Sequence, residues 1–280
     1  MAIIKNPLTV ISGGGDIDKL INGTITSIES NVSSMRASIF AGCNQLSSVS
    51  FPNATYIPAS AFLNCTGLTN ISSSFPSVIS LAESCFNGCS QLSNVSFPNV
   101  SSIANNAFRS CTLFNVYDFS NATSIGNYAF DGCNNLSTIA FPKVQTVGQY
   151  AFQGTHPTTA SLPEVLTISS SAFRSVSTLT TLDIPKCTTL DTYAFYGCSN
   201  LTSISAPKLT SIGNYAFYNC KPSSLTLENT SVVTLGGSSQ FHSSVMVNIR
   251  VPSNLVETYK TATNWSTLYN NGRVSFSAIS

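Results

Sequence analysis

A motif recurs along this chain about every 22 residues. The heptapeptide Ser-Ile-Gly-Asn-Tyr-Ala-Phe occurs twice, at residues 124–130 and 211–217. Degenerate copies align on a phenylalanine that usually follows alanine, and successive copies are 22, 24, 22, 22, 22, 21, 22 and 22 residues apart. The nine aligned residues are Phe40, Phe62, Phe86, Phe108, Phe130, Phe152, Phe173, Phe195 and Phe217. An interval this constant indicates an internal repeat rather than a chance match.

A unit of this length is too short to bury an apolar face by itself, so each copy must stack on its neighbours. In one copy, Leu136, Ile139 and Phe141 end in period-two alternation, which predicts a short strand, and Pro142 then removes a backbone donor. A Val-x-x-Ile stretch supplies a second apolar segment, and Ala-Phe-x-Gly-Cys fits a single helical turn that returns the chain. The pattern predicts a β-dominant α/β repeat solenoid with short parallel strands and single helical turns.

The pattern Leu136-x-x-Ile139-x-Phe141-x-x-Val144 resembles the strand signature of leucine-rich repeats. The extension Ala-Phe-x-Gly-Cys-x-x-Leu resembles the BspA-type subfamily of these repeats. The resemblance covers residues 25–252, in nine copies and a degenerate tenth at residues 225–251. It implies a right-handed superhelix, with an N-terminal segment or cap at residues 1–24 and a C-terminal cap at residues 253–280.

One position departs from the leucine-rich-repeat pattern. Relatives place Asn or Cys nine residues into the signature, whereas this chain has mostly apolar residues there, with cysteine only at Cys187: Ala54, Val100, Ala122, Val144 and Leu209. The usual buried asparagine ladder is therefore absent, and we expect the backbone groups at this corner to be satisfied in another way.

Composition excludes several classes of function. Only 8% of the residues are charged and the formal net charge is +1, which argues against a nucleic-acid partner. No run of 18 apolar residues exists, so we expect no membrane insertion. Residues 1–7 lack the apolar segment of a secretory signal. We expect either that the protein is not exported by that route or that its signal has been removed.

Cysteines occupy a repeat position of their own. Seven of the nine follow the repeat phenylalanine by three residues, and Thr155 and Val176 fill this position in the other two copies. Because threonine and valine are accepted there, the position is interpreted as a packing site for a small residue. Cys85 and Cys89 have a spacing found in metal sites, but no histidine or second cysteine pair accompanies them. We expect buried, reduced thiols and no metal.

No catalytic motif is present. The two histidines, His156 and His242, are not accompanied by a nucleophile motif, and Gly13-Gly14-Gly15 precedes no strand–helix unit that could hold phosphate. Asp118 and Asp183 share a repeat position but are three coils apart, roughly 14 Å at strand spacing, which is too far for an acid–base pair. The sequence predicts neither an enzyme nor a cofactor.

Two surfaces are candidates for ligand binding. The first is the outward face of the strands, which carries Asp118 and Asp183; the alternative is a merely solvated sheet. The second is a series of tyrosines, interrupted by Ser171, whose alternative role is packing on neighbouring coils. Its members two residues before the phenylalanine are Tyr128, Tyr150, Tyr193 and Tyr215, and those directly after it are Tyr196 and Tyr218.

The C-terminal cap is predicted to start with a helix. Asn254 and Glu257 have capping-box spacing, and residues 273–279 alternate as a final strand. Trp265 is expected to anchor this cap rather than to bind a ligand.

These observations predict a non-catalytic binding scaffold for a protein or glycan ligand. The resemblance implies bacterial cell-surface or host-interaction proteins such as adhesins, and hence a cell-surface or extracellular location. One alternative is a structural or receptor-binding component of a phage-like particle, with a virion-associated or cytoplasmic location. Another is a spacer without a ligand.

Overall fold

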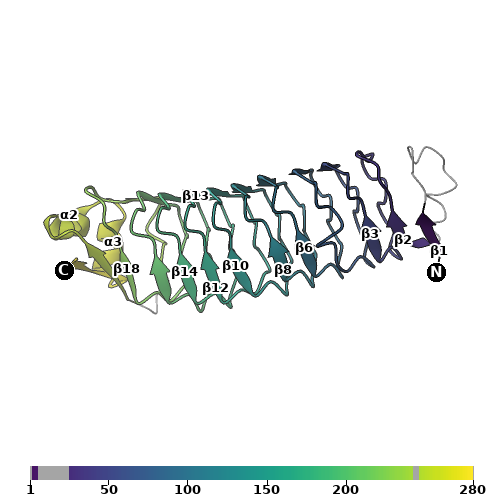
Figure 1. The fold of residues 1–280 in the computed structure, drawn as a ribbon. Helices are drawn as coiled ribbons and strands as arrows, with labels where there is room; N and C mark the ends of the chain where they lie inside the picture. Colours follow the sequence, from purple (N-terminus) through teal and green to yellow (C-terminus); the bar gives the residue numbers. More distant parts are fainter. Residues whose placement is uncertain (1, 6–24, 242–245, 280) are drawn as a thin grey trace. The chain divides into compact units, whose positions relative to one another are not determined.

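The computed structural model describes residues 2–5, 25–241 and 246–279 (Figure 1). They belong to two compact units, Met1–Leu136 and Ser137–Ser280, and each unit is described by itself. Apart from residues 2–5, the expected N-terminal cap lies outside the described residues, and so does His242.

The first unit is built from short parallel strands. Its longer strands are β1 (Ala2–Lys5), β2 (Ile25–Glu29), β3 (Ser48–Ser50), β6 (Asn94–Ser96) and β8 (Val116–Asp118). Its two-residue return strands are β4 (Tyr56–Ile57), β5 (Ser80–Leu81), β7 (Ser102–Ile103) and β9 (Ser124–Ile125). Strands of equivalent position pair in parallel, in the order β1-β2-β3, β6-β8, β4-β5 and β7-β9.

The second unit repeats this plan. One sheet contains β10 (Thr138–Ala140), β12 (Thr159–Ser161), β14 (Thr181–Asp183) and β16 (Ser203–Ser205). The return strands β11 (Thr146–Val147), β13 (Thr167–Ile168), β15 (Thr189–Leu190), β17 (Ser211–Ile212) and β19 (Thr234–Leu235) form another. A third contains β18 (Ser224–Thr226), β20 (Val247–Val251) and β21 (Val274–Ala278). The predicted β-dominant solenoid of parallel strands is confirmed.

The segment that returns the chain is a series of tight turns, and the single helical turn predicted there is not formed. Asp131 N–H donates to Tyr128 O (3.2 Å), and Cys133 N–H donates to Phe130 O (3.0 Å). The alternate amides leave the coil: Phe108 N–H donates to a carbonyl of the next coil, 2.9 Å away. A helical turn would direct its amides along its own axis and leave these coil-to-coil bonds unmade.

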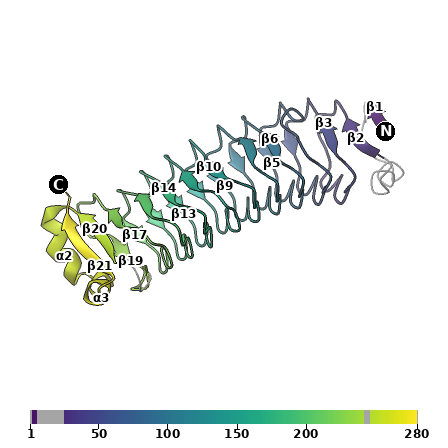
Figure 2. The same ribbon diagram turned by 90° about the horizontal axis from the view of Figure 1, so that it is seen from below.

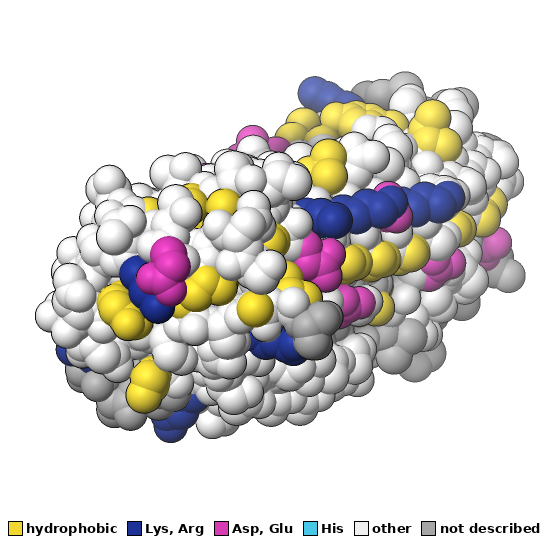
Figure 3. Space-filling view, turned by 90° about the vertical axis from the view of Figure 1, so that its left-hand side faces the viewer, with side chains coloured by type: hydrophobic (Ala, Val, Ile, Leu, Met, Phe, Trp, Pro, Cys, Tyr) yellow, Lys and Arg dark blue, Asp and Glu magenta, His cyan; other side chains and the backbone are white. Residues whose placement is uncertain are grey.

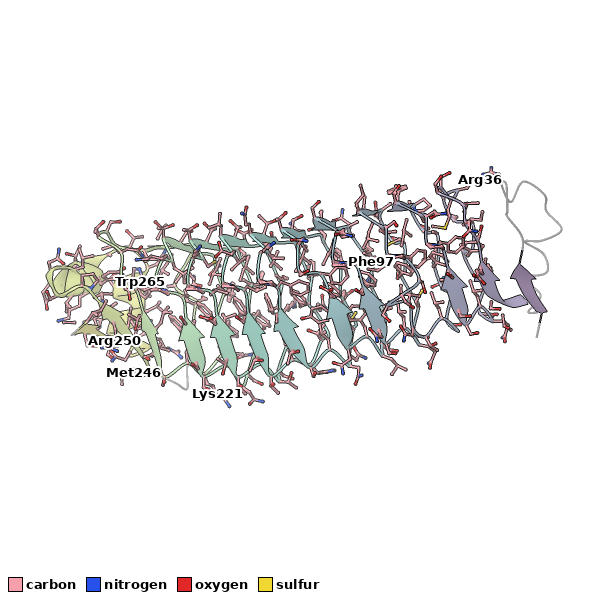
Figure 4. All side chains as sticks on the ribbon, in the orientation of Figure 1. Arg36, Phe97, Lys221, Met246, Arg250 and Trp265 are labelled. Atoms are coloured by element: carbon pink, nitrogen blue, oxygen red, sulfur yellow. The ribbon has the colours of Figure 1, made fainter. Side chains whose placement is uncertain are left out.

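Stacked phenylalanine rings fill the core of each unit. In the first unit, the ring centroids of Phe62 and Phe86 are 5.2 Å apart, and those of Phe86 and Phe108 are 5.5 Å apart. In the second unit, Phe173 and Phe195 are 4.9 Å apart. Each of these side chains is fully buried. The phenylalanine that ends the strand signature, usually followed by proline, forms a second column in the first unit. In this column Phe97 points into the interior of its coil (Figure 4).

Cysteine thiols form a further stacked series beside the phenylalanine columns. The predicted burial of these thiols is confirmed. In six of the described coils, Sγ donates to the carbonyl oxygen of the repeat phenylalanine one coil earlier, at 3.0–3.2 Å: Cys65 to Phe40, Cys89 to Phe62, Cys111 to Phe86, Cys133 to Phe108, Cys198 to Phe173 and Cys220 to Phe195. Burial raises the pKa of the Cys65 thiol to about 12, so this thiol stays protonated and can donate.

The corner that lacks the asparagine ladder is satisfied by backbone turns and by hydrogen bonds from neighbouring polar side chains. Val100 N–H donates to Phe97 O (3.1 Å) and closes a tight turn. One coil later, Asn121 Nδ2 donates to Pro98 O at 2.8 Å. The corner therefore needs no buried asparagine, as the sequence led us to expect.

The C-terminal segment adds a 3₁₀ turn, η1 (Ser253–Leu255), and two short helices, α2 (Val256–Thr261) and α3 (Trp265–Asn270), beside β21 (Figures 1 and 2). The helix start is confirmed, but the predicted capping box is wrong. Neither η1 nor α2 has a side-chain cap, because their N-cap positions hold Pro252 and Leu255, which have no side-chain acceptor. Glu257 accepts a bond from Lys260 (2.7 Å).

Two aromatic side chains anchor the C-terminal segment to Val233, the residue that precedes the return strand β19. Tyr259 Oη accepts a bond from Val233 N–H (3.0 Å), and Trp265 Nε1 donates to Val233 O (2.7 Å). Both side chains are buried, and their rings meet edge to face with centroids 5.3 Å apart. Trp265 (labelled in Figure 4) is therefore a structural anchor, as predicted.

Candidate partner-binding surfaces

The residue two positions before each repeat phenylalanine has a positive φ angle, between 55° and 62°, in all nine copies. Such a conformation is uncommon for L-residues other than asparagine and aspartate, and it is an outlier for bulky ones. The positive φ angle directs the backbone N–H of this residue towards the next coil. Tyr193 N–H, for example, donates to Asn214 O at 2.9 Å. The occupants, in chain order, are Ser38, Ser60, Ser84, Asn106, Tyr128, Tyr150, Ser171, Tyr193 and Tyr215. The backbone therefore requires this angle but not a tyrosine.

Four of the predicted tyrosines come together in the second unit. Tyr193 and Tyr215 stack with ring centroids 5.1 Å apart and planes 7° apart, and Tyr196 and Tyr218 stack at 5.4 Å and 9°. Within a coil the rings meet edge to face, at 5.5 Å for Tyr193 with Tyr196. All four side chains are only half-buried. The structure thus brings them into one cluster, which we call the tyrosine cluster.

An arginine lies at the N-terminal end of the tyrosine cluster. The Arg174 guanidinium carbon is 5.3 Å from the ring centroid of Tyr196 and 5.9 Å from that of Tyr193. Both distances are within the range of cation–π attraction. Arg174 therefore extends the cluster by one coil, although the position two residues before Phe173 holds the buried Ser171.

Tyr128 belongs to the first unit and has a different neighbourhood. The guanidinium of Arg109 lies 5.1 Å from the Tyr128 ring centroid, and Arg109 Nε donates to Asp131 Oδ2 at 3.0 Å. Partial burial raises the pKa of the Asp131 carboxyl, and the Arg109 charge opposes this shift. Tyr150 is half-buried in the second unit, separated from the tyrosine cluster by the coil that carries Ser171.

The strand face is the other predicted surface. Asp118 ends β8 in the first unit, where its Oδ1 accepts a bond from Ser120 N–H (3.1 Å). Asp183 ends β14 in the second unit, in register with Ser161 and Ser205. The structure places the two aspartates in different units, and the residues that flank Asp183 on the sheet are small and polar.

Hydroxyl groups at the strand edges make bonds along the stack. Thr180 Oγ1 donates to Thr158 O (2.9 Å), and Thr210 Oγ1 donates to Thr188 O (3.1 Å). In the first unit, Thr123 Oγ1 donates to Ser101 O (3.0 Å) in the same way. Figure 3, which faces the C-terminal end, shows a mostly white surface of backbone and uncharged polar side chains, with the charged side chains gathered mainly in a row along one side. Many surface hydroxyls therefore serve the fold itself.

The described residues also bear on metal binding and on membrane insertion. Among them, no group of three or more His, Cys, Asp or Glu side chains is placed to hold a metal ion. His156 is exposed in the loop of the shortened repeat. No helix in the described part of the chain has the length and apolar character that a membrane span requires.

Sequence reasoning missed the arginines. Arg109, Asp131, Arg174, Tyr196 and Tyr218 all follow a repeat phenylalanine directly. Aligning this position across copies would have placed Arg174 next to Tyr196, because residues at one repeat position stack in adjacent coils.

Comparison with known proteins agrees with this architecture. Stacked coils of one short strand, a corner and an apolar return define a leucine-rich-repeat solenoid. Residues 19–121, 101–207 and 166–270 match the family described as BspA type leucine rich repeat region (6 copies). The chain therefore belongs to the BspA-type leucine-rich-repeat family. No curated protein shows a significant match.

Solved structures with similar folds are distant in sequence. A leucine-rich repeat protein from Bacteroides ovatus ATCC 8483 is 17% identical, with a TM-score of 0.50 over 93% of this chain and 85% of that one. A leucine rich cell surface protein from Faecalibacterium prausnitzii A2-165 is 20% identical, with a TM-score of 0.48 over 90% and 79%. The leucine rich repeat protein of T. pallidum is 26% identical, with a TM-score of 0.42 over 51% and 70%.

Proposed function

We propose that this protein is a non-catalytic scaffold that binds a protein partner through the tyrosine cluster. The main supporting observation is that the backbone does not require tyrosine at this repeat position. The same repeat position, with the same positive φ, holds serine or asparagine in the first four copies. The cluster leaves four tyrosines half-exposed. Half-exposed aromatic side chains are the type that concentrates binding energy in protein interfaces.

We also propose display on a bacterial cell surface, with adhesion or host recognition as the consequence. The support is family membership, since the BspA-type resemblance implies cell-surface and host-interaction proteins. The strand face offers hydrogen-bonding groups but little apolar area, so it is the weaker candidate for a protein partner.

The test is a binding screen of the full chain against extracellular-matrix proteins and glycans, followed by two matched double variants. Replacing Tyr193 and Tyr215 by serine should weaken binding of an identified partner by more than about 2 kcal/mol. Serine is native at this position in other coils, so the backbone should tolerate it.

The control changes Thr181 and Ser203 to alanine on the strand face and should leave the affinity within about twofold, because neither side chain belongs to the cluster. If the control pair abolishes binding and the tyrosine pair does not, the partner uses the strand face. If no partner is captured at all, the chain is a spacer and the proposal fails.

A further inference from the structure

Arg174 forms no ion pair with any described residue of its own unit. Among the described residues, no carboxylate lies within ion-pair distance of its guanidinium, which contacts Tyr193 and Tyr196 instead. The side chain is half-buried against these rings. Contact with two aromatic faces restricts its motion, so it is held in place before any ligand arrives.

In the first unit, an arginine at the same repeat position forms an ion pair within the protein. Arg109 also directly follows a repeat phenylalanine and also lies over a tyrosine ring, but the next coil supplies Asp131 at 3.0 Å. The next coil after Arg174 supplies Tyr196. The two coil pairs have the same register, because the residue after each arginine donates its N–H to Asp131 O or to Tyr196 O, both at 2.7 Å.

The three glutamates of the second unit pair with lysines, and its two aspartates, Asp183 and Asp191, form no ion pair with Arg174. Glu164 pairs with Lys186 at 2.7 Å, Glu228 pairs with Lys208 at 3.5 Å, and Glu257 pairs with Lys260 at 2.7 Å. A guanidinium matches a carboxylate with two parallel hydrogen bonds, so an incoming carboxylate is the group that best completes the Arg174 site.

Ring geometry indicates what kind of molecule brings this carboxylate. The planes of Tyr193 and Tyr215 are 7° apart and those of Tyr196 and Tyr218 are 9° apart, so within each pair the inner faces cover each other. Arg174 lies over the N-terminal side of the first ring of each pair. These contacts occupy the ring faces between the stacked tyrosines and towards Arg174. Next to Arg174 the ring edges and phenol groups are therefore the available contacts, and they suit amino-acid side chains and peptide carbonyls.

We propose that Arg174 and the tyrosine cluster form a docking site for an acidic peptide segment of a protein partner. An Asp or Glu of the segment pairs with Arg174, and an adjacent apolar side chain packs on the tyrosine edges. This inference rests on the proposed function and adds the chemistry of the partner.

The experiment selects random dodecapeptides displayed on phage against the immobilised full chain. Wild-type protein should enrich peptides with Asp or Glu next to an apolar residue. The most enriched sequence is then synthesised and titrated against wild type and three single variants, whose folding is checked by circular dichroism and Tm.

Arg174→Gln removes the charge and should weaken the peptide by about tenfold or more. Gln153→Glu should also weaken peptide binding, although it changes no tyrosine. Gln153 has the repeat position of Arg174 one coil earlier, so the new carboxylate would pair with Arg174 and compete with the peptide. The control Arg109→Gln removes an arginine that already has a partner and should leave the affinity within about twofold. Added salt should weaken the wild-type complex.

Three outcomes would overturn the inference: no peptide is enriched, the enriched peptides lack acidic residues, or Arg174→Gln binds as wild type does. A parallel titration with heparin tests an anionic glycan, and binding of heparin without any acidic peptide would also overturn it. The proposed function is judged separately by the matrix-protein screen. A chain that binds a matrix protein through its tyrosines but selects no acidic peptide keeps that function and loses this inference.

Discussion

Tyr193 has a φ angle of 62°, which bulky L-residues rarely adopt. The angle is required by the fold, because it directs the amide to the next coil. The ring is not required by the fold, since Asn106 has a similar φ angle, 56°, at the same repeat position. Asparagine adopts positive φ more easily than tyrosine, so the backbone would favour the smaller residue.

We therefore expect Tyr193→Asn to change the free energy of unfolding by less than about 1.5 kcal/mol, since the lost ring stacking is partly offset by a more favourable backbone. Chemical denaturation of the two proteins measures this difference. A loss of 3 kcal/mol or more, as for a core aromatic, would show that the ring is a packing residue.

The buried thiols link stability to pH. Burial raises the pKa of Cys65 and of Cys187 from 9.0 to about 12. Above pH 9 the unfolded chain loses these protons while the folded chain keeps them. Stability contributed by the protonated thiols is thus fully present below pH 9 and is lost as the pH rises towards about 12.

Chemical denaturation with a reductant present, at pH 7, 9 and 10, should show stability falling above pH 9. Cys65→Val should reduce this slope by about 1.4 kcal/mol per pH unit, because one thiol no longer titrates. Valine occupies the equivalent position at Val176, so the substitution should fold. An identical slope in both proteins would contradict the linkage.

At the scale of one structural element, each coil is stable only through its neighbours. Phe86 stacks on Phe62 at 5.2 Å and on Phe108 at 5.5 Å, and it also meets Phe75 and Phe97 at 6.2 and 6.0 Å. One side chain therefore contributes to the interfaces on both sides of its coil, and its loss weakens both.

Phe86→Ala should lower the free energy of unfolding by about 3–5 kcal/mol, because it leaves a cavity within a fully buried column. The control is Ile79→Ala, at a side chain that is 58% exposed, and it should cost less than about 1 kcal/mol. Equal melting temperatures for Phe86→Ala and wild type would refute the assigned repeat phase.

At the scale of the whole molecule, a repeat chain must end its stack without leaving apolar surface and backbone groups open. In the second unit, η1, α2, α3 and β21 do this at the C-terminal end. Both backbone groups of Val233 are satisfied by side chains of this segment, through Tyr259 and Trp265.

Tyr259→Phe should therefore destabilise the protein by about 1–3 kcal/mol, because the buried Val233 N–H loses its acceptor. Tyr269→Phe is the matched control: this side chain is 38% exposed, and the change should be nearly neutral. Thermal unfolding of both variants measures the difference, and equal Tm values would show that the hydroxyl bond is unimportant.

Spacing alone determined the architecture of this protein. Phenylalanines 22 residues apart cannot be buried within one coil, so they predicted the stacked core in which Phe86 lies between Phe62 and Phe108. Substitution within a repeat position, as by Thr155 and Val176, likewise predicted that the cysteines are buried. Sequence also located the tyrosines of the candidate site, and their ligand-binding role remains a prediction.

The sequence pattern left open which groups meet between coils. Turns replaced the expected helical turn, and Arg174 lay over Tyr193 and Tyr196 of the next coil. The physical reason is that these contacts depend on backbone φ and on the register between residues about 22 apart. Apolar periodicity specifies which side chains face inward, but it does not specify where each amide and charge finds its partner.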